Sequence, residues 1–169
     1  MIATGEAVQN HESATAALSE LVAAAELACR DKILFERTVQ VGPYRVRLRS
    51  TSTLAGAFFS HCLMSADSSS APDLDILIRV GPAPPPWNFP HTSERHLERL
   101  HLSGVSSLAA FYDHDRRFWS VLDETGRRGL FWIHQFEDIP FWEQAAPFKT
   151  LLGWFLADKP DVLIHAGVV

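Results

Sequence analysis

The chain has 169 residues, of which 47% are hydrophobic and 21% charged, with a net charge of −5. This apolar content excludes an intrinsically disordered chain, and the length suits one domain with a substantial core. The acidic balance argues against a general nucleic-acid binder, and no apolar run approaches the roughly 18 residues of a membrane span.

The first part of the chain predicts a helix followed by a β-hairpin. Apolar residues recur at helical spacing over residues 14–30, which predicts an amphipathic helix with a narrow, alanine-rich face. Residues 38–49 then alternate, with Gly42 and Pro43 as the turn. The polar face of this hairpin carries Arg45, Arg47 and Arg49. We interpret it as a solvated strand face, with a phosphate-binding stripe as the alternative.

The middle of the chain predicts a short buried helix, a strand and a rigid connector. The compact apolar run 54–64 predicts the helix, and the alternation over residues 73–80 predicts the strand. Residues 81–90 contain five prolines, which favour polyproline II and cannot pair as a central strand. We interpret this stretch as a surface connector, with a ligand for a proline-reading domain as the alternative.

Three further strands are predicted over residues 107–112, 117–122 and 129–134, joined by short polar turns. Their richness in Phe, Tyr and Trp is typical of a half-buried antiparallel sheet. The turn Asp113-His114-Asp115 also resembles a fragment of a cation-binding loop, but a hairpin tip explains it more simply.

The last part predicts a helix over residues 147–158 and a buried strand over residues 162–169. We therefore expect an α+β fold. An N-terminal helix leads into a mostly antiparallel, aromatic-rich sheet of five to seven strands, and a C-terminal helix and a final strand follow. Because an apolar strand is an unusual place for a domain to end, we expect the chain to continue beyond it. Without that continuation, we expect the stripe of Phe148, Leu152 and Phe155 to be partly exposed.

Two cysteines, Cys29 and Cys62, are too few for a disulfide scaffold. We expect both to be small, reduced, buried side chains, with a single bridge as the alternative. The N-terminus lacks the basic segment and the unbroken apolar run of a signal peptide. Together these features indicate a cytoplasmic protein that is not embedded in a membrane.

The sequence offers no complete catalytic or metal-binding motif. His91, His96, His101 and His114 fall close together, but their spacing does not bring ligands to one helix face. Neither a nucleophile motif nor a phosphate-binding glycine loop occurs. We expect four of the five tryptophans to serve core or interface packing rather than a ligand pocket; these four are Trp119, Trp132, Trp142 and Trp154.

The most specific passage is Ile139–Leu156, IPFWEQAAPFKTLLGWFL, together with the strand VLIHAGVV at residues 162–169. It contains an aromatic pair, a Glu, an Ala-Pro, an apolar helix with a Trp and a strand with a His. This pattern resembles the segment just ahead of the ATP-binding core in bacterial serine kinases similar to HPr kinase/phosphatase, whose core is shared with phosphoenolpyruvate carboxykinase. The resemblance covers about residues 38–169, and the last 30 residues carry most of its specificity.

The resemblance implies the N-terminal region of an ATP-dependent serine kinase, a phosphotransferase that acts on a protein or peptide. ATP and Mg²⁺ would bind a phosphate loop beyond Val169, so we expect no cofactor and no activity in this chain alone. His165 matches a recurrent family position and is a candidate nucleotide-proximal residue, with a core histidine as the alternative.

The same resemblance divides the chain into an N-terminal helical segment (1–37), an α+β domain (38–140) and the start of the kinase core (141–169). We expect no nucleic-acid or membrane partner, and a homo-oligomer is left open. The alternative function is a complete, small, non-catalytic protein-interaction module, which would use the proline connector and exposed aromatic faces.

Overall fold

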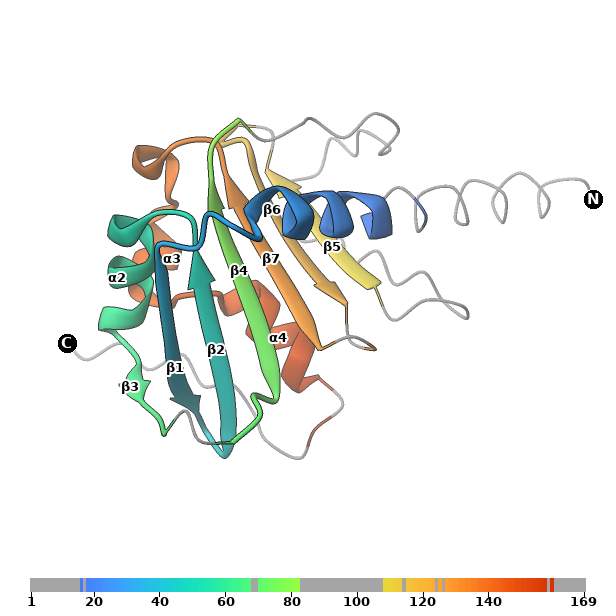
Figure 1. Ribbon diagram of the computed structural model, residues 1–169. Helices are drawn as coiled ribbons and strands as arrows, with labels where there is room; N and C mark the ends of the chain where they lie inside the picture. Colours follow the sequence, from blue (N-terminus) through green and yellow to red (C-terminus); the bar gives the residue numbers. More distant parts are fainter. Residues whose placement is uncertain are drawn as a thin grey trace, which may run out of the picture.

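The computed structural model describes residues 16, 18–67, 70–82, 108–113, 115–123, 125, 127–157 and 159. Its centre is a mixed sheet of seven strands in the order β3-β1-β2-β4-β7-β6-β5 (Figure 1). The strands are β1 (Phe35–Val41), β2 (Tyr44–Ser50), β3 (Met64–Ser65), β4 (Leu74–Val80), β5 (Leu108–Asp113), β6 (Phe118–Asp123) and β7 (Arg128–Ile133). The fold is therefore α+β, as the sequence predicts.

Four of the six strand pairings are antiparallel, which confirms the mostly antiparallel sheet. The hairpin of β1 and β2 forms one end, and the meander of β5, β6 and β7 forms the other. β4 joins them by pairing in parallel with both β2 and β7. Parallel neighbours need a crossover connection, and α2 (Thr53–His61) lies in the one between β2 and β4.

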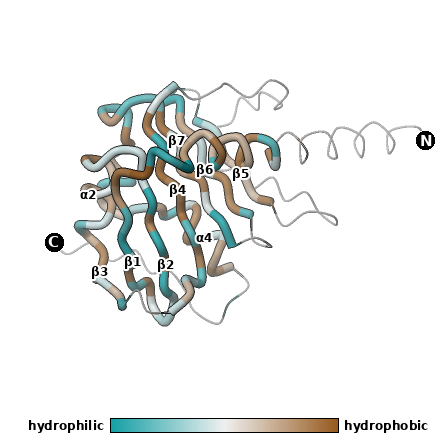
Figure 2. The backbone as a smooth tube through the Cα atoms, in the orientation of Figure 1, coloured by the Kyte–Doolittle hydropathy of each residue, from teal (hydrophilic) through white to brown (hydrophobic). Residues whose placement is uncertain are grey.

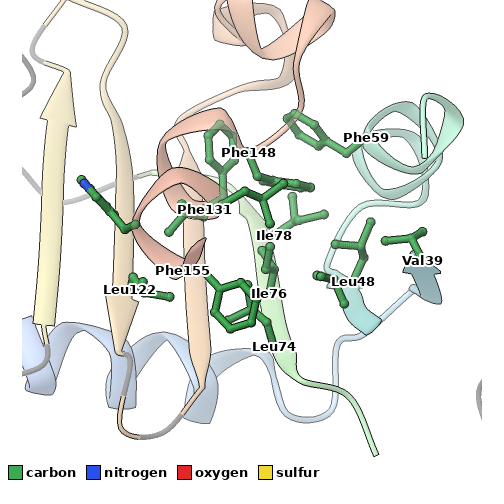
Figure 3. Packing of buried hydrophobic residues seen from close by; sticks show 14 of the residues in the cluster. Val39, Leu48, Phe59, Leu74, Ile76, Ile78, Leu122, Phe131, Phe148 and Phe155 are labelled. Carbon is green, nitrogen blue, oxygen red and sulfur yellow. The ribbon is translucent and has the colours of Figure 1, made fainter. Parts of the chain in front are cut away.

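Three helices lie on one face of the sheet: α2, α3 (Phe141–Ala145) and α4 (Lys149–Leu156). They cover the side on which Leu74, Ile76 and Ile78 of β4 are buried (Figure 3). Aromatic rings fill the space between sheet and helices, with the centroid of Phe59 4.7 Å from that of Phe148 and 5.2 Å from that of Phe131. Burying each such side chain contributes about 1.5–3 kcal/mol, so this layer dominates the stability of the fold.

The first helix, residues 18–29, covers part of the opposite face (Figure 1). It packs on the meander and on Leu77 of β4. The buried side chains of the helix are Leu18, Leu21, Val22, Ala25 and Cys29. No described helix lies over β1 and β2 on this side, where hydrophilic residues recur along both strands (Figure 2). This face therefore has a covered apolar half and an open polar half.

The structure corrects two expectations about side-chain burial. Cys62 is exposed, because it follows directly after the last turn of α2, whereas Cys29 is buried; both are free thiols. The stripe of Phe148, Leu152 and Phe155 is buried rather than partly exposed. Phe148 packs against Phe59 of α2 and Phe131 of β7, and Phe155 packs against Tyr44 of β2.

Local structure at the ends of elements also departs from expectation. α4 begins at Lys149 rather than at Pro147, because Phe148 has a left-handed backbone with φ of 57°. The two-residue strand β3, the single-turn 3₁₀ helix at Phe136–Asp138 and α3 were not predicted. The predicted strand at 162–169 and residues 83–90 of the connector lie outside the described residues. No described helix is long and apolar enough to cross a membrane.

Candidate functional site

The open polar half of the sheet carries a chain of alternating positive and negative side chains. Asp75, only 9% exposed, stands in the parallel register of β4 directly beside Arg47 of β2. Its Oδ2 accepts hydrogen bonds from Nε of Arg47 at 2.9 Å and from Nη2, and its Oδ1 accepts from Nε of Arg49 at 2.8 Å. One carboxylate thus joins two of the three arginines of β2.

The chain of charges continues to the first helix and to the meander. Glu26 lies 3.9 Å from Nη2 of Arg49 and 3.2 Å from Nη1 of Arg128. Nη2 of Arg128 in turn donates to Asp123 at 2.8 Å. Three arginines therefore meet three carboxylates, and their formal charges cancel.

The partners of Arg47 and of Arg128 favour the charged state of these two guanidinium groups. The hydrogen bond to Asp75 is the main cause that raises the pKa of Arg47, and the hydrogen bond to Asp123 does the same for Arg128. Arg47 and Arg49 are consequently neither a simple solvated face nor open phosphate ligands. Both side chains lie on the open polar half of the sheet and are partly exposed, as the solvated-face interpretation expects, but β4 also brings a nearly buried carboxylate beside them.

Arg45, the third arginine of the row, differs from its neighbours. No described residue forms an ion pair with its guanidinium, although its backbone N–H donates to Oδ2 of Asp73 at 2.8 Å. Thr38 and Gln40 of β1 stand on the same open half-face. Nε2 of Gln40 already donates to the carbonyl of Gly42 at 2.7 Å, so this end of the surface can offer the Arg45 cation, the Thr38 hydroxyl and the amide oxygen of Gln40 to a polar ligand.

A second arrangement lies in the passage that carries the kinase resemblance. Glu143 of α3 is 1% exposed, and its Oε2 accepts a hydrogen bond from the backbone N–H of Phe148 at 2.6 Å. Burial raises the pKa of Glu143 to about 7, while the Phe148 hydrogen bond and the charge of Lys149 act in the opposite direction. The carboxylate thus binds one of the N–H groups that lack an intrahelical partner at the start of α4.

The chemistry available at Glu143 is that of a helix cap. It satisfies a backbone donor and holds the left-handed turn at Phe148, whose ring is buried among Phe59 and Phe131. Glu143 belongs to the passage that resembles the kinase family, but no pattern in the sequence predicts a role for it. Its position six residues before the start of α4 is a weak signal, because the sequence does not reveal the left-handed turn at Phe148 that lies between them.

The predicted site residue His165 lies outside the described residues, as do His91, His96, His101 and His114. Among the parts of the chain that the structure describes, no three His, Cys, Asp or Glu side chains are grouped as a metal site. Asp113 accepts a hydrogen bond from the backbone N–H of Arg116 at 2.8 Å, which is the turn chemistry expected of a hairpin tip.

The four tryptophans at positions 119, 132, 142 and 154 serve packing, as the sequence predicts. Trp119, Trp132 and Trp154 are buried, and Trp142 is partly buried against the core. The indole N–H of Trp132 donates to the carbonyl of Gly81 at 3.0 Å, and Arg79 lies over its ring at 4.1 Å. Trp132 therefore anchors the start of the proline-rich connector.

Comparisons of the chain with protein-family models, with curated proteins and with solved structures find no match.

Proposed function

We propose that this chain is the N-terminal region of a cytoplasmic, ATP-dependent serine kinase that resembles HPr kinase and phosphorylates serine in a protein or peptide. The observation that carries the proposal is the architecture of residues 139–156. The passage with the most specific family pattern folds as a continuous unit of two helices against the sheet.

Several residues of that passage have a structural role, although Phe141 of the aromatic pair is 70% exposed. Ile139, Phe148 and Trp154 are buried in the core, and the buried Glu143 caps α4. Such a passage can fix the position of the chain that follows it relative to the sheet. This supports a protein in which a leading domain and a separate ATP-binding core have different functions.

In that division, the residues of this chain bind substrate or hold the assembly together. Phosphoryl transfer depends on a phosphate loop, a metal ion and a base, and the loop motif does not occur in these 169 residues. The polar half-face with Arg45, Thr38 and Gln40 is the surface we assign to the peptide substrate. Its hydrogen-bonding side chains suit an extended, polar segment better than an apolar one.

The proposal is tested first by the coding sequence that follows the codon for Val169. We expect an open frame that encodes a glycine hairpin and then GxxxxGK[ST] within roughly 25 residues. The protein encoded by the whole frame should transfer the γ-phosphate of ATP to serine in a peptide, and replacing the loop lysine with alanine should abolish transfer. A stop codon at this point, or phosphotransfer by the 169 residues alone, contradicts the proposal.

A second candidate function is a non-catalytic protein-interaction module. It is favoured by the large hydrophobic side chains that stand in solvent, of which Met64 is 77% and Phe141 is 70% exposed. Exposed apolar and aromatic groups are frequent anchors of protein interfaces. A stop codon after Val169 with intact flanking sequence would favour this candidate.

A further inference from the structure

The side chains of the polar half-face form rows that cross the strands. Residues directly opposite each other in neighbouring strands share a face, and so do alternate residues along one strand. Four residues of β1 separate the first row from the far row, a distance of about 13 Å. The row nearest the turn between β1 and β2 contains Met64, Gln40 and Arg45, the middle row contains Thr38, Arg47 and Asp75, and the far row contains Glu36 and Arg49.

The charge changes from one end of this surface to the other. At the first row, Arg45 forms no ion pair with a described residue, and Oδ2 of Asp73 binds its backbone N–H rather than its guanidinium. At the far row, Glu36 is exposed and forms no ion pair with a described residue. The other charged groups of the three rows pair with one another; they are Arg47, Arg49 and Asp75. The surface therefore has a positive end at Arg45 and a negative end at Glu36.

We propose that this surface binds an extended peptide that carries an acidic and a basic residue four positions apart. The acidic side chain of the peptide binds the Arg45 guanidinium, and the basic side chain binds the Glu36 carboxylate. The residue midway between them lies over Thr38 and Arg47. This inference names the class of peptide, and it rests on the proposed function for the assignment of the surface to a peptide substrate.

The spacing follows from the geometry of extended chains. A peptide that lies along β1 and β2 has the same rise per residue as the strands, and every second side chain points to the same side. Charges four positions apart therefore reach the first and the far row together. Charges three positions apart point to opposite sides of the peptide, so only one of them can reach the sheet. Complementary charges of this kind select the partner and its position more than they raise affinity.

The experiment is an NMR titration of the ¹⁵N-labelled 169-residue chain with short capped peptides of serine, threonine and glycine. Each peptide carries one Glu and one Lys, so it has no net charge. At least one of the two orders, Glu before Lys or Lys before Glu, should bind with the four-position spacing and shift the amide signals of β1 and β2. The three-position spacing should weaken binding about five- to tenfold.

A charge reversal tests the contact with Arg45 by a change of preference. Arg45→Glu should weaken binding of the Glu and Lys peptide about five- to tenfold and should favour a peptide with two Lys four positions apart. Arg127→Glu is the matched control, because this exposed arginine at the turn before β7 carries the same charge but is not in the three rows. It should keep the wild-type preference. Circular dichroism checks that each variant is folded.

Absence of binding by every peptide overturns the inference, as does equal binding at both spacings. A folded Arg45→Glu variant that keeps the wild-type preference overturns it too. These outcomes are separate from a failure of the proposed function, which the coding sequence after Val169 decides. A stop codon there, together with binding selective for the four-position spacing, would reject the kinase and support the class of peptide.

Discussion

The carboxylate of Glu143 accepts the backbone N–H of Phe148 at 2.6 Å, and both residues are buried where α3 passes into α4. The contact joins a buried acid to a residue with a left-handed backbone, φ 57°. The buried carboxylate makes stability depend on pH, and the left-handed backbone makes position 148 sensitive to the residue that occupies it.

The stability of the protein should fall as the pH rises through the range in which Glu143 titrates. Its ordinary pKa is 4.5 and burial raises the pKa in the folded protein to about 7. The folded state therefore keeps a proton that the unfolded state releases above about pH 4.5. The favourable contribution of this group is complete below that pH and is lost by about pH 7, a change of about 3 kcal/mol in the free energy of unfolding.

Glu143→Gln should remove most of this pH dependence, because the amide oxygen can still accept the Phe148 N–H and carries no charge. The measurement is urea unfolding of both proteins between pH 4.5 and 8. Equal slopes of stability against pH in the wild type and the variant would rule out Glu143 as the source.

Phe148→Gly should be less destabilising than Phe148→Ala. Both variants delete the ring from its contacts with Phe59 and Phe131, at a cost of about 3–5 kcal/mol. Only glycine removes the penalty of the left-handed backbone, which is about 1–2 kcal/mol for other residues. The difference in midpoint between the two variants in chemical denaturation measures this penalty. The reverse order would mean that the turn relaxes once the ring is gone.

Two helical glycines should respond oppositely to alanine. A Cβ at Gly56 of α2 would overlap the ring of Phe35 in β1, whereas one at Gly153 of α4 meets nothing within 4 Å. Gly56→Ala should therefore destabilise the protein by about 1–3 kcal/mol through overpacking. Gly153→Ala should stabilise it by about 0.5–1 kcal/mol through helix propensity. Thermal unfolding of the two single variants tests both signs.

Asp75 should contribute to stability through the two arginines that it joins. Asp75→Ala leaves Arg47 and Arg49 without their shared acceptor, and we expect a loss of about 1–3 kcal/mol. Arg45→Ala on the same strand is the control, because no described residue pairs with its guanidinium; its effect should stay within about 0.5 kcal/mol. Comparable losses in the two variants would show that Asp75 adds nothing specific.

The regular elements could be predicted because their patterns are local. The alternation of Leu74, Ile76 and Ile78 specifies β4 and its buried face, and the turn at Gly42-Pro43 specifies the first hairpin. The pairing of Arg47 with Asp75 could not be predicted, since it depends on β2 and β4 becoming neighbours across 28 residues of chain. The left-handed backbone at Phe148 could not be predicted from the sequence either, because phenylalanine does not favour that conformation and tertiary packing of its ring in the core enforces it.

The ion pair of Glu26 with Arg128 bears on the order in which the protein folds during synthesis. The two residues are 102 positions apart, and the first helix packs on β5, β6 and β7, all of which leave the ribosome long after it. Contacts of such high sequence separation form late, because a long loop must close before they can stabilise anything. The apolar stripe of the first helix therefore stays without its packing partners until β5, β6 and β7 have been synthesised. During that time it is an exposed apolar segment of the kind that ribosome-associated chaperones bind.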